Sequence, residues 1–128
     1  MQNSLTEDLP RRRPGRHGFN KTELEKRGIQ HTFGAPVTGA ISVCDGIAVS
    51  FGDGNVRFFR PGHAFTTIKA HKGVVLCLAA DKDHIITGGD DGRFSKISTN
   101  GKVKEIANFN SKWVDCVAAK NGITACSS

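Results

Sequence analysis

The sequence has no apolar run near the roughly 18–20 residues that a bilayer-spanning helix needs, so we expect no segment embedded in a membrane. The stretch from Met1 to Pro14 also lacks the apolar core of a signal peptide, which argues against export. Proline is scarce, with 4 residues against 15 glycines among 128, and this balance favours a turn-rich fold over a low-complexity chain. The length predicts one domain.

Cysteine is present four times, but not in a pattern that binds metal. No two cysteines are spaced C-x-x-C and none has a histidine three to five residues away, so we expect no structural zinc. Without an export signal, the thiols indicate a reducing compartment, and we expect a cytoplasmic protein without disulfides. The cysteines are then small buried hydrophobic residues: Cys44, Cys77, Cys116 and Cys126.

The positive charge is concentrated at the N-terminus. The formal net charge is +6, and residues 1–30 hold seven basic against four acidic side chains, so we predict a basic, flexible segment there. Arg11, Arg12, Arg13 and Arg16 are candidate phosphate contacts, which makes nucleic-acid binding an alternative function. It is the less favoured one, because no series of aromatic residues accompanies the arginines.

From His31 onward the chain consists of short β-type runs separated by turn dipeptides. Asp-Gly and Asn-Gly pairs supply the residues of positive φ that tight hairpins require. They fall at Asp45-Gly46, Asp53-Gly54, Asp91-Gly92, Asn100-Gly101 and Asn121-Gly122. The pattern predicts an all-β fold over residues 31–128.

These runs repeat along the sequence. Ile47, Ile85 and Ile123 are each 38 residues apart, as are the pairs Asp53-Gly54 and Asp91-Gly92. Similar segments open at Val37, Val74 and Trp113. Four strands in a unit of about 40 residues are typical of propeller blades. We therefore predict a partial β-propeller with two four-stranded antiparallel blades, about 31–70 and 71–110, and an incomplete third, 111–128.

The second unit, AHKGVVLCLAADKDHIITGGDDGRFSKIS from Ala70 to Ser98, resembles a WD repeat. Ala70-His71 stands at the Gly-His position, Asp91-Gly92 at the turn, and Ile97-Ser98 at the Trp-Asp position. The chain is similar to divergent bacterial WD-repeat β-propeller proteins over residues 31–128. The resemblance implies a noncatalytic scaffold for protein–protein interaction, without a cofactor, in which His71, Thr87 and Asp91 form a structural hydrogen-bond network.

Two full units and part of a third cannot close a propeller ring. The chain is then a truncated gene product, a fragment, or a protein that assembles with other copies, and we favour a truncated gene product, an N-terminal portion of such a protein. The open blade edges and the uncovered blade face predict that the chain associates with itself. Trp113, the single tryptophan, has two interpretations: packing between blades, or an exposed contact for a protein partner.

Two catalytic or metal-binding alternatives are weaker. The set of His71, Thr87 and Asp91 is compatible with a threonine nucleophile activated by the histidine, but the structural network explains the same residues. An acidic group could hold a cation only if its members converged on one point, whereas we expect them at opposite ends of one strand. That group is Asp81, Asp83, His84, Asp90 and Asp91. We predict no catalytic, metal or cofactor site, since no phosphate-binding glycine motif is present either.

Overall fold

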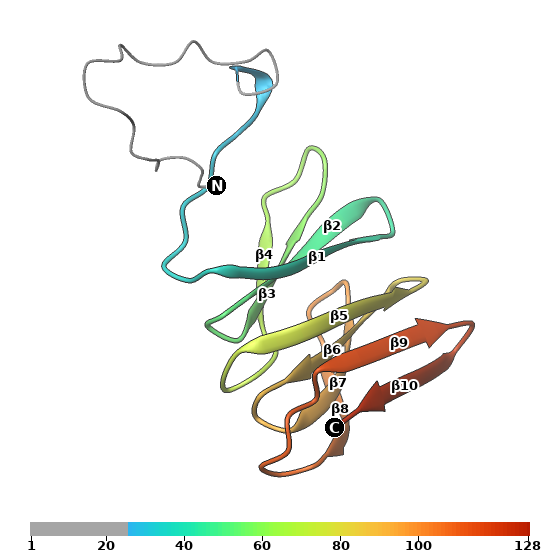
Figure 1. Ribbon diagram of the computed structural model, residues 1–128. Helices are drawn as coiled ribbons and strands as arrows, with labels where there is room; N and C mark the ends of the chain where they lie inside the picture. Colours follow the sequence, from blue (N-terminus) through green and yellow to red (C-terminus); the bar gives the residue numbers. More distant parts are fainter. Residues whose placement is uncertain (1–25) are drawn as a thin grey trace. The chain divides into compact units, whose positions relative to one another are not determined.

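The computed structural model describes residues 26–128, and its strands all lie between Val37 and Ser127 (Figure 1). In chain order they are β1 (Val37–Val43), β2 (Gly46–Phe51), β3 (Asn55–Phe59), β4 (Thr66–Lys69), β5 (Val75–Asp81), β6 (His84–Gly89), β7 (Arg93–Ser98), β8 (Val103–Asn108), β9 (Cys116–Lys120) and β10 (Ile123–Ser127).

The strands form three antiparallel sheets. The first has the order β1-β2-β3-β4, the second β5-β6-β7-β8, and the third contains β9 and β10. Each sheet is a simple meander, because every strand pairs with its neighbour in the sequence. The prediction of an all-β fold with two four-stranded antiparallel sheets is confirmed, and the third sheet has two strands. That these sheets are the blades of a partial propeller stays a prediction. None of these sheets closes on itself within residues 26–128.

The repeat seen in the sequence is also a repeat of backbone geometry. A register shift interrupts the first strand of each four-stranded sheet, between Val37 and Gly39 in β1 and between Val75 and Cys77 in β5. Gly54 and Gly92, which are 38 residues apart, have φ of 87° and 81°. These shared irregularities show that the first two sheets are copies of one unit.

The sheets are stacked, with the initial strands β1, β5 and β9 side by side (Figure 1). The second sheet is covered on both faces, and its inner strand β6 is accordingly buried almost continuously, whereas its edge strand β8 is mostly exposed. Strands β9 and β10 alternate between exposed and half-buried residues. The core between the first two sheets consists of Val43, Ala48, Val56, Phe58, Ile68, Ala70, Val75, Ile85 and Ile97. The core beneath the third consists of Ala79, Ile86, Phe94 and Val114.

Backbone hydrogen bonds join the turns at Asp53-Gly54 and Asp91-Gly92 to the chain that leads into the next sheet. The carbonyl of Gly54 accepts from the backbone nitrogens of Ala70 and His71, both at 3.0 Å. The carbonyl of Gly92 accepts from the backbone nitrogen of Phe109 at 2.8 Å. A turn of one unit therefore fixes the path of the chain into the following unit.

The first hairpin differs from the predicted one. Val43 pairs with Gly46, so the two-residue loop is Cys44-Asp45, and Cys44 rather than Gly46 has a positive φ, 53°. Gly46 is required for another reason: a Cβ there would overlap the carbonyl oxygen of Phe59 on the adjacent strand. The prediction of a turn at Asp45-Gly46 is thus wrong by one residue, because glycine here allows close approach of two strands.

The chain divides into two units, residues 1–34 and 35–128, and all strands belong to the second. In the described part of the first unit, the rings of His31 and Phe33 are stacked with centroids 6.0 Å apart. Most of residues 1–30, the segment that we predict to be flexible, lies outside the described residues. Among the described residues, no helix is long and apolar enough to cross a membrane.

Candidate functional site

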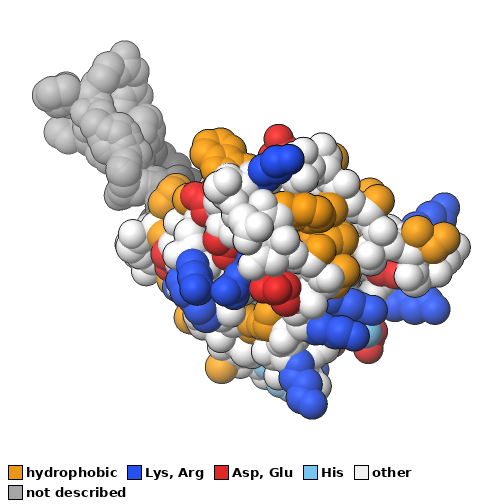
Figure 2. Space-filling model, turned by 90° about the horizontal axis from the view of Figure 1, so that it is seen from below, with side chains coloured by type: hydrophobic (Ala, Val, Ile, Leu, Met, Phe, Trp, Pro, Cys, Tyr) orange, Lys and Arg blue, Asp and Glu red, His pale blue; other side chains and the backbone are white. Residues whose placement is uncertain are grey.

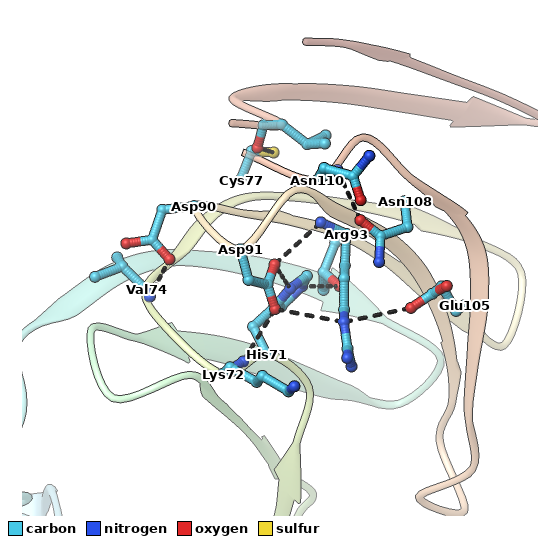
Figure 3. A network of polar contacts seen from close by, with 12 residues as sticks. His71, Lys72, Val74, Cys77, Asp90, Asp91, Arg93, Glu105, Asn108 and Asn110 are labelled. Atoms are coloured by element: carbon cyan, nitrogen blue, oxygen red, sulfur yellow. Dashed lines mark hydrogen bonds and ion pairs between the residues drawn. The ribbon is translucent and has the colours of Figure 1, made fainter. Parts of the chain in front are cut away.

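The most extensive polar arrangement among the described residues includes His71, which lies between β4 and β5 (Figure 3). Its Nε2 is 2.8 Å from Oγ1 of Thr87 on β6, and its Nδ1 is 2.9 Å from Oδ1 of Asp91 in the β6–β7 turn. The imidazole and Thr87 are fully buried, and the side chain of Asp91 is 9% exposed. The structure thus brings together the three residues of the predicted network.

The two hydrogen-bond partners of His71 determine which of its ring nitrogens carries a hydrogen. The Asp91 carboxylate only accepts hydrogen bonds, so Nδ1 of His71 carries a hydrogen and donates to it. In the neutral ring, Nε2 then accepts from the hydroxyl of Thr87. Both nitrogens are engaged within the protein, and neither is left to act on a substrate.

Asp91 is the centre of the network, as the dashed lines in Figure 3 show. Its Oδ1 also accepts from the backbone nitrogen of Arg93 at 3.1 Å, and its Oδ2 accepts from that of Lys72 at 3.0 Å. The Arg93 guanidinium is 3.9 Å from Oδ2 and 3.3 Å from the carboxylate of Glu105 on β8. One carboxylate therefore ties the loop before β5 to the turn before β7.

Burial of the Asp91 side chain acts to raise its pKa, because it removes water from the charged form. The hydrogen bonds from Lys72, His71 and Arg93, together with the attraction of His71, act in the opposite direction and prevail. The pKa of Asp91 is therefore below its ordinary value of 3.8. The network stabilises the charged carboxylate in the folded protein.

This shift predicts how stability depends on pH. A carboxyl whose pKa is lower in the folded state than in the unfolded state stabilises the folded protein. This stabilisation is fully present at pH values above the pKa in the unfolded state, about 3.9 for aspartate, and it is lost as the pH falls through the pKa in the folded state. We expect the free energy of urea unfolding to fall between neutral pH and pH values below about 4. The fall should be smaller in Asp91→Asn. An equal loss in the wild type and the variant would contradict the assignment.

Two glycines make room for the network. A Cβ on Gly89 would overlap Nδ1 of His71 and lie 2.8 Å from Oδ1 of Asp91. A Cβ on Gly73 would overlap Oδ1 of Asp90, which accepts from the backbone nitrogen of Val74 at 2.9 Å. Sequence reasoning missed both glycines, although the pair Gly88-Gly89 directly before the two aspartates was a signal.

The first sheet contains a partial counterpart at Asp53, which is 38 residues before Asp91. Oδ1 of Asp53 accepts from the backbone nitrogen of Asn55 at 3.1 Å, and Oδ2 is 3.5 Å from the Arg57 guanidinium. Burial raises the pKa of Asp53, but the bonds from Asn55 and the attraction of Arg57 outweigh it and lower the pKa. Asp53 therefore secures its turn with an arginine in place of the buried histidine.

The acidic group does not converge on one point. Asp81 accepts from the backbone nitrogens of Asn121 and Gly122 at 3.1 and 2.6 Å, while Asp83 pairs with His84 at 2.9 Å. Within residues 26–128 there is no group of three or more His, Cys, Asp or Glu side chains arranged to hold a metal ion. The carboxylate of Asp81 instead joins the second sheet to the β9–β10 turn of the third.

The four cysteines are free thiols, but the prediction that they are buried is wrong: Cys44 and Cys116 are exposed, and Cys77 and Cys126 are half-buried. Burial, with the nearby groups Cys116, Asp115 and Cys126 acting in the same direction against a hydrogen bond from Gly88, raises the pKa of Cys77 to about 11. Its Sγ donates to the carbonyl of Val114 at 3.4 Å. A thiol with so high a pKa is protonated at neutral pH and is a weak nucleophile.

Trp113 does not begin a strand as predicted. It lies between β8 and β9 with 61% of its surface exposed, and β9 starts only at Cys116. The neighbouring Val114 is the buried residue, and its backbone nitrogen donates to the carbonyl of Gly89 at 3.0 Å. Packing between sheets is therefore provided by Val114, and the exposed indole of Trp113 can contact solvent or a partner.

The remaining candidates, Arg11, Arg12, Arg13 and Arg16, lie outside the described residues. What the described site can do is hold two loops together, because its histidine and threonine have no exposed surface. Comparisons with protein-family models, with curated proteins and with solved structures found no match to the chain.

Proposed function

We propose that the chain is a noncatalytic interaction module of the WD-repeat β-propeller kind, in which each sheet is a blade. The observation that carries the proposal is the stacking of repeated antiparallel meanders with their first strands β1, β5 and β9 adjacent (Figure 1). In a propeller the first strand of each blade lines the axis, and the blades pack face to face around it.

The His71 network supports a scaffold rather than an enzyme. A general base must lie within hydrogen-bond reach of a substrate proton, but the imidazole of His71 is fully buried with both nitrogens bonded to Thr87 and Asp91. Such a network fixes the loops at one end of the second sheet. Fixed loops present a constant surface to a partner at low entropic cost.

The contact surface that we propose includes Trp113. Large exposed aromatic residues are enriched among the residues that dominate binding energy at protein interfaces. Trp113 is the single tryptophan and is 61% exposed on a connection whose next residue, Val114, is anchored in the core. Its position combines exposure with a rigid support.

A peptide that binds the chain can be selected from a displayed random library against the immobilised protein. We expect this peptide to bind Trp113→Ala at least tenfold more weakly than the wild type, because an anchor residue at an interface contributes about 2 kcal/mol or more to binding. Val103→Ala is the matched control, because Val103 is an exposed apolar residue on β8 and should bind as the wild type does. Titration calorimetry gives both affinities. Equal affinity of the Trp113 variant and the control would refute the role of Trp113.

Nucleic-acid binding through Arg11–Arg16 stays the alternative prediction. It requires an affinity for labelled DNA or RNA that falls steeply as salt is added, because phosphate contacts release counterions. Replacing the four arginines with alanine separates the two functions: the peptide affinity should persist, and any salt-sensitive nucleic-acid affinity should disappear.

A further inference from the structure

The third sheet can be aligned with the second through their hairpins. Asp81 pairs with His84 across the β5–β6 loop, and Lys120 pairs with Ile123 across the β9–β10 loop, an offset of 39 residues. The same offset relates the following side chains of β9 and β10 to those of β5 and β6: Cys116 to Cys77, Ala118 to Ala79, and Ala125 to Ile86.

One face of the second sheet is covered by the third sheet. Ala79 and Ile86 lie in the core that Val117 and Ala119 complete from β9, and Cys77 bonds to the carbonyl of Val114. The equivalent face of the third sheet, with Cys116, Ala118 and Ala125, is exposed, and beside it Ile123 is 74% exposed. We call this exposed face the outer face of the third sheet. Figure 2 shows apolar side chains at the surface, interspersed with basic, acidic and other side chains.

The first sheet has the complementary uncovered face. With an offset of 38, set by the pairing of Val43 with Gly46, Ala40 corresponds to Leu78, Ser42 to Ala80, and Ile47 to Ile85. Leu78, Ala80 and Ile85 are the residues through which the second sheet packs on the first. Ala40 and Ser42 are exposed and Ile47 is 48% exposed. We call this the outer face of the first sheet.

We propose that the outer face of the third sheet binds the outer face of the first sheet in a second copy of this chain. The contact repeats, between molecules, the sheet-to-sheet packing that occurs twice within one molecule. This partner is additional to the proposed peptide-binding function and does not depend on it, because it rests on the repeat and not on Trp113.

Charges at the proposed junction are complementary. Within the chain, Asp81 contacts the turn residues Asn121 and Gly122 of the next sheet. At the junction the equivalent of Asp81 is Lys120, and the equivalent turn is Cys44-Asp45 of the second copy. The Asp45 side chain is 66% exposed and lies 3.4 Å from the Arg60 guanidinium, which is itself exposed, so the Lys120 ammonium of one copy can meet this carboxylate.

The contact joins two different faces, so it is heterologous. A heterologous contact continues from copy to copy until a ring closes or a filament forms. Association should therefore pass beyond a dimer as concentration rises, and it should stop when either face is blocked.

Two blocked variants test the arrangement by sedimentation velocity. Ala118→Arg places a charged side chain on the outer face of the third sheet, and Ala40→Arg does so on that of the first. Both residues are exposed, so the isolated fold should accept arginine. We expect the wild type to form species larger than a dimer, and each variant alone to be monomeric. An equimolar mixture of the two variants should form a 1:1 dimer that grows no further.

Ile106→Arg, on the exposed edge strand β8, is the matched control and should associate as the wild type does. A wild type that stays monomeric at millimolar concentration would overturn the proposal. Arginine variants that still associate alone would also overturn it, because this result would mean that the chains pair edge to edge through β10 and not through the sheet faces. A mixture of folded variants that stays monomeric would also overturn it. Circular dichroism checks the folding of each variant.

If either arginine variant is unfolded, a charge exchange decides the question. Lys120→Glu and Asp45→Lys should each weaken association, because each places two like charges at the junction. A mixture of these two single variants should associate beyond a dimer with the chains in alternation, because the introduced glutamate of one chain faces the introduced lysine of the other and the unchanged Asp45 faces the unchanged Lys120. The wild-type strength should return when both changes are in one chain. Failure of that double variant to associate better than the single variants would refute the junction.

Discussion

His71→Ala is expected to lower the free energy of unfolding by about 2–4 kcal/mol, because each buried polar group left without its partner costs about 1–3 kcal/mol. The substitution removes the imidazole that bonds Thr87 at 2.8 Å and Asp91 at 2.9 Å. Thr87 then has a buried hydroxyl without this bond, while Asp91 keeps the backbone nitrogens of Lys72 and Arg93. Urea unfolding followed by circular dichroism measures the change.

The matched control is His63→Ala. His63 is exposed between β3 and β4, 3.5 Å from the Arg60 guanidinium, so its loss should change stability by less than about 0.5 kcal/mol. A similar loss in both variants would mean that the buried network contributes nothing particular to stability.

A double-mutant cycle isolates the bond between His71 and Asp91. Residues in one network give coupling energies of about 0.5–3 kcal/mol, so His71→Ala combined with Asp91→Ala should cost less than the sum of the single changes. Strict additivity would show that the two residues do not stabilise each other, despite the 2.9 Å between Nδ1 and Oδ1.

The strand order and the 38-residue repeat could be predicted because turn chemistry is local. Gly54 and Gly92 adopt positive φ in the same turn of consecutive sheets, and an Asp-Gly pair announces that turn in the sequence. Gly46 shows where such reasoning fails. Its glycine is needed because the backbone of Phe59 comes close, and this contact between strands leaves no local signal.

The same distinction applies to the candidate site. Resemblance to a repeat places His71, Thr87 and Asp91 together, and the structure joins them by hydrogen bonds. The interpretation of Trp113 as a residue packed between blades is wrong by one residue, because a large aromatic side chain looks like a core residue, whereas the smaller Val114 is the one that is fully buried. The interpretation of Trp113 as an exposed partner contact stays a prediction. Which of two adjacent apolar residues faces inward is decided by packing against the neighbouring sheet.

Gly89→Ala is expected to destabilise the protein by about 2.5–6 kcal/mol, since overpacking costs about 1–3 kcal/mol and a lost hydrogen bond to a charged group about 1.5–3 kcal/mol. The new Cβ would overlap Nδ1 of His71 and approach its Cγ to 2.8 Å, so the imidazole must move away from Asp91. Gly89 ends β6 in a buried position, which leaves little room for the backbone to shift.

Gly34→Ala provides the matched control for this prediction, because a Cβ at Gly34 meets no atom within 4 Å. Its stability should be unchanged or slightly higher, as alanine restricts the unfolded chain. The mechanism is tested by repeating Gly89→Ala in the His71→Ala background. With the imidazole absent, the same substitution should cost clearly less, because its main steric conflict has been removed. An equal cost in both backgrounds, measured by urea unfolding, would show that Gly89 is required for the backbone of β6 and not to accommodate His71.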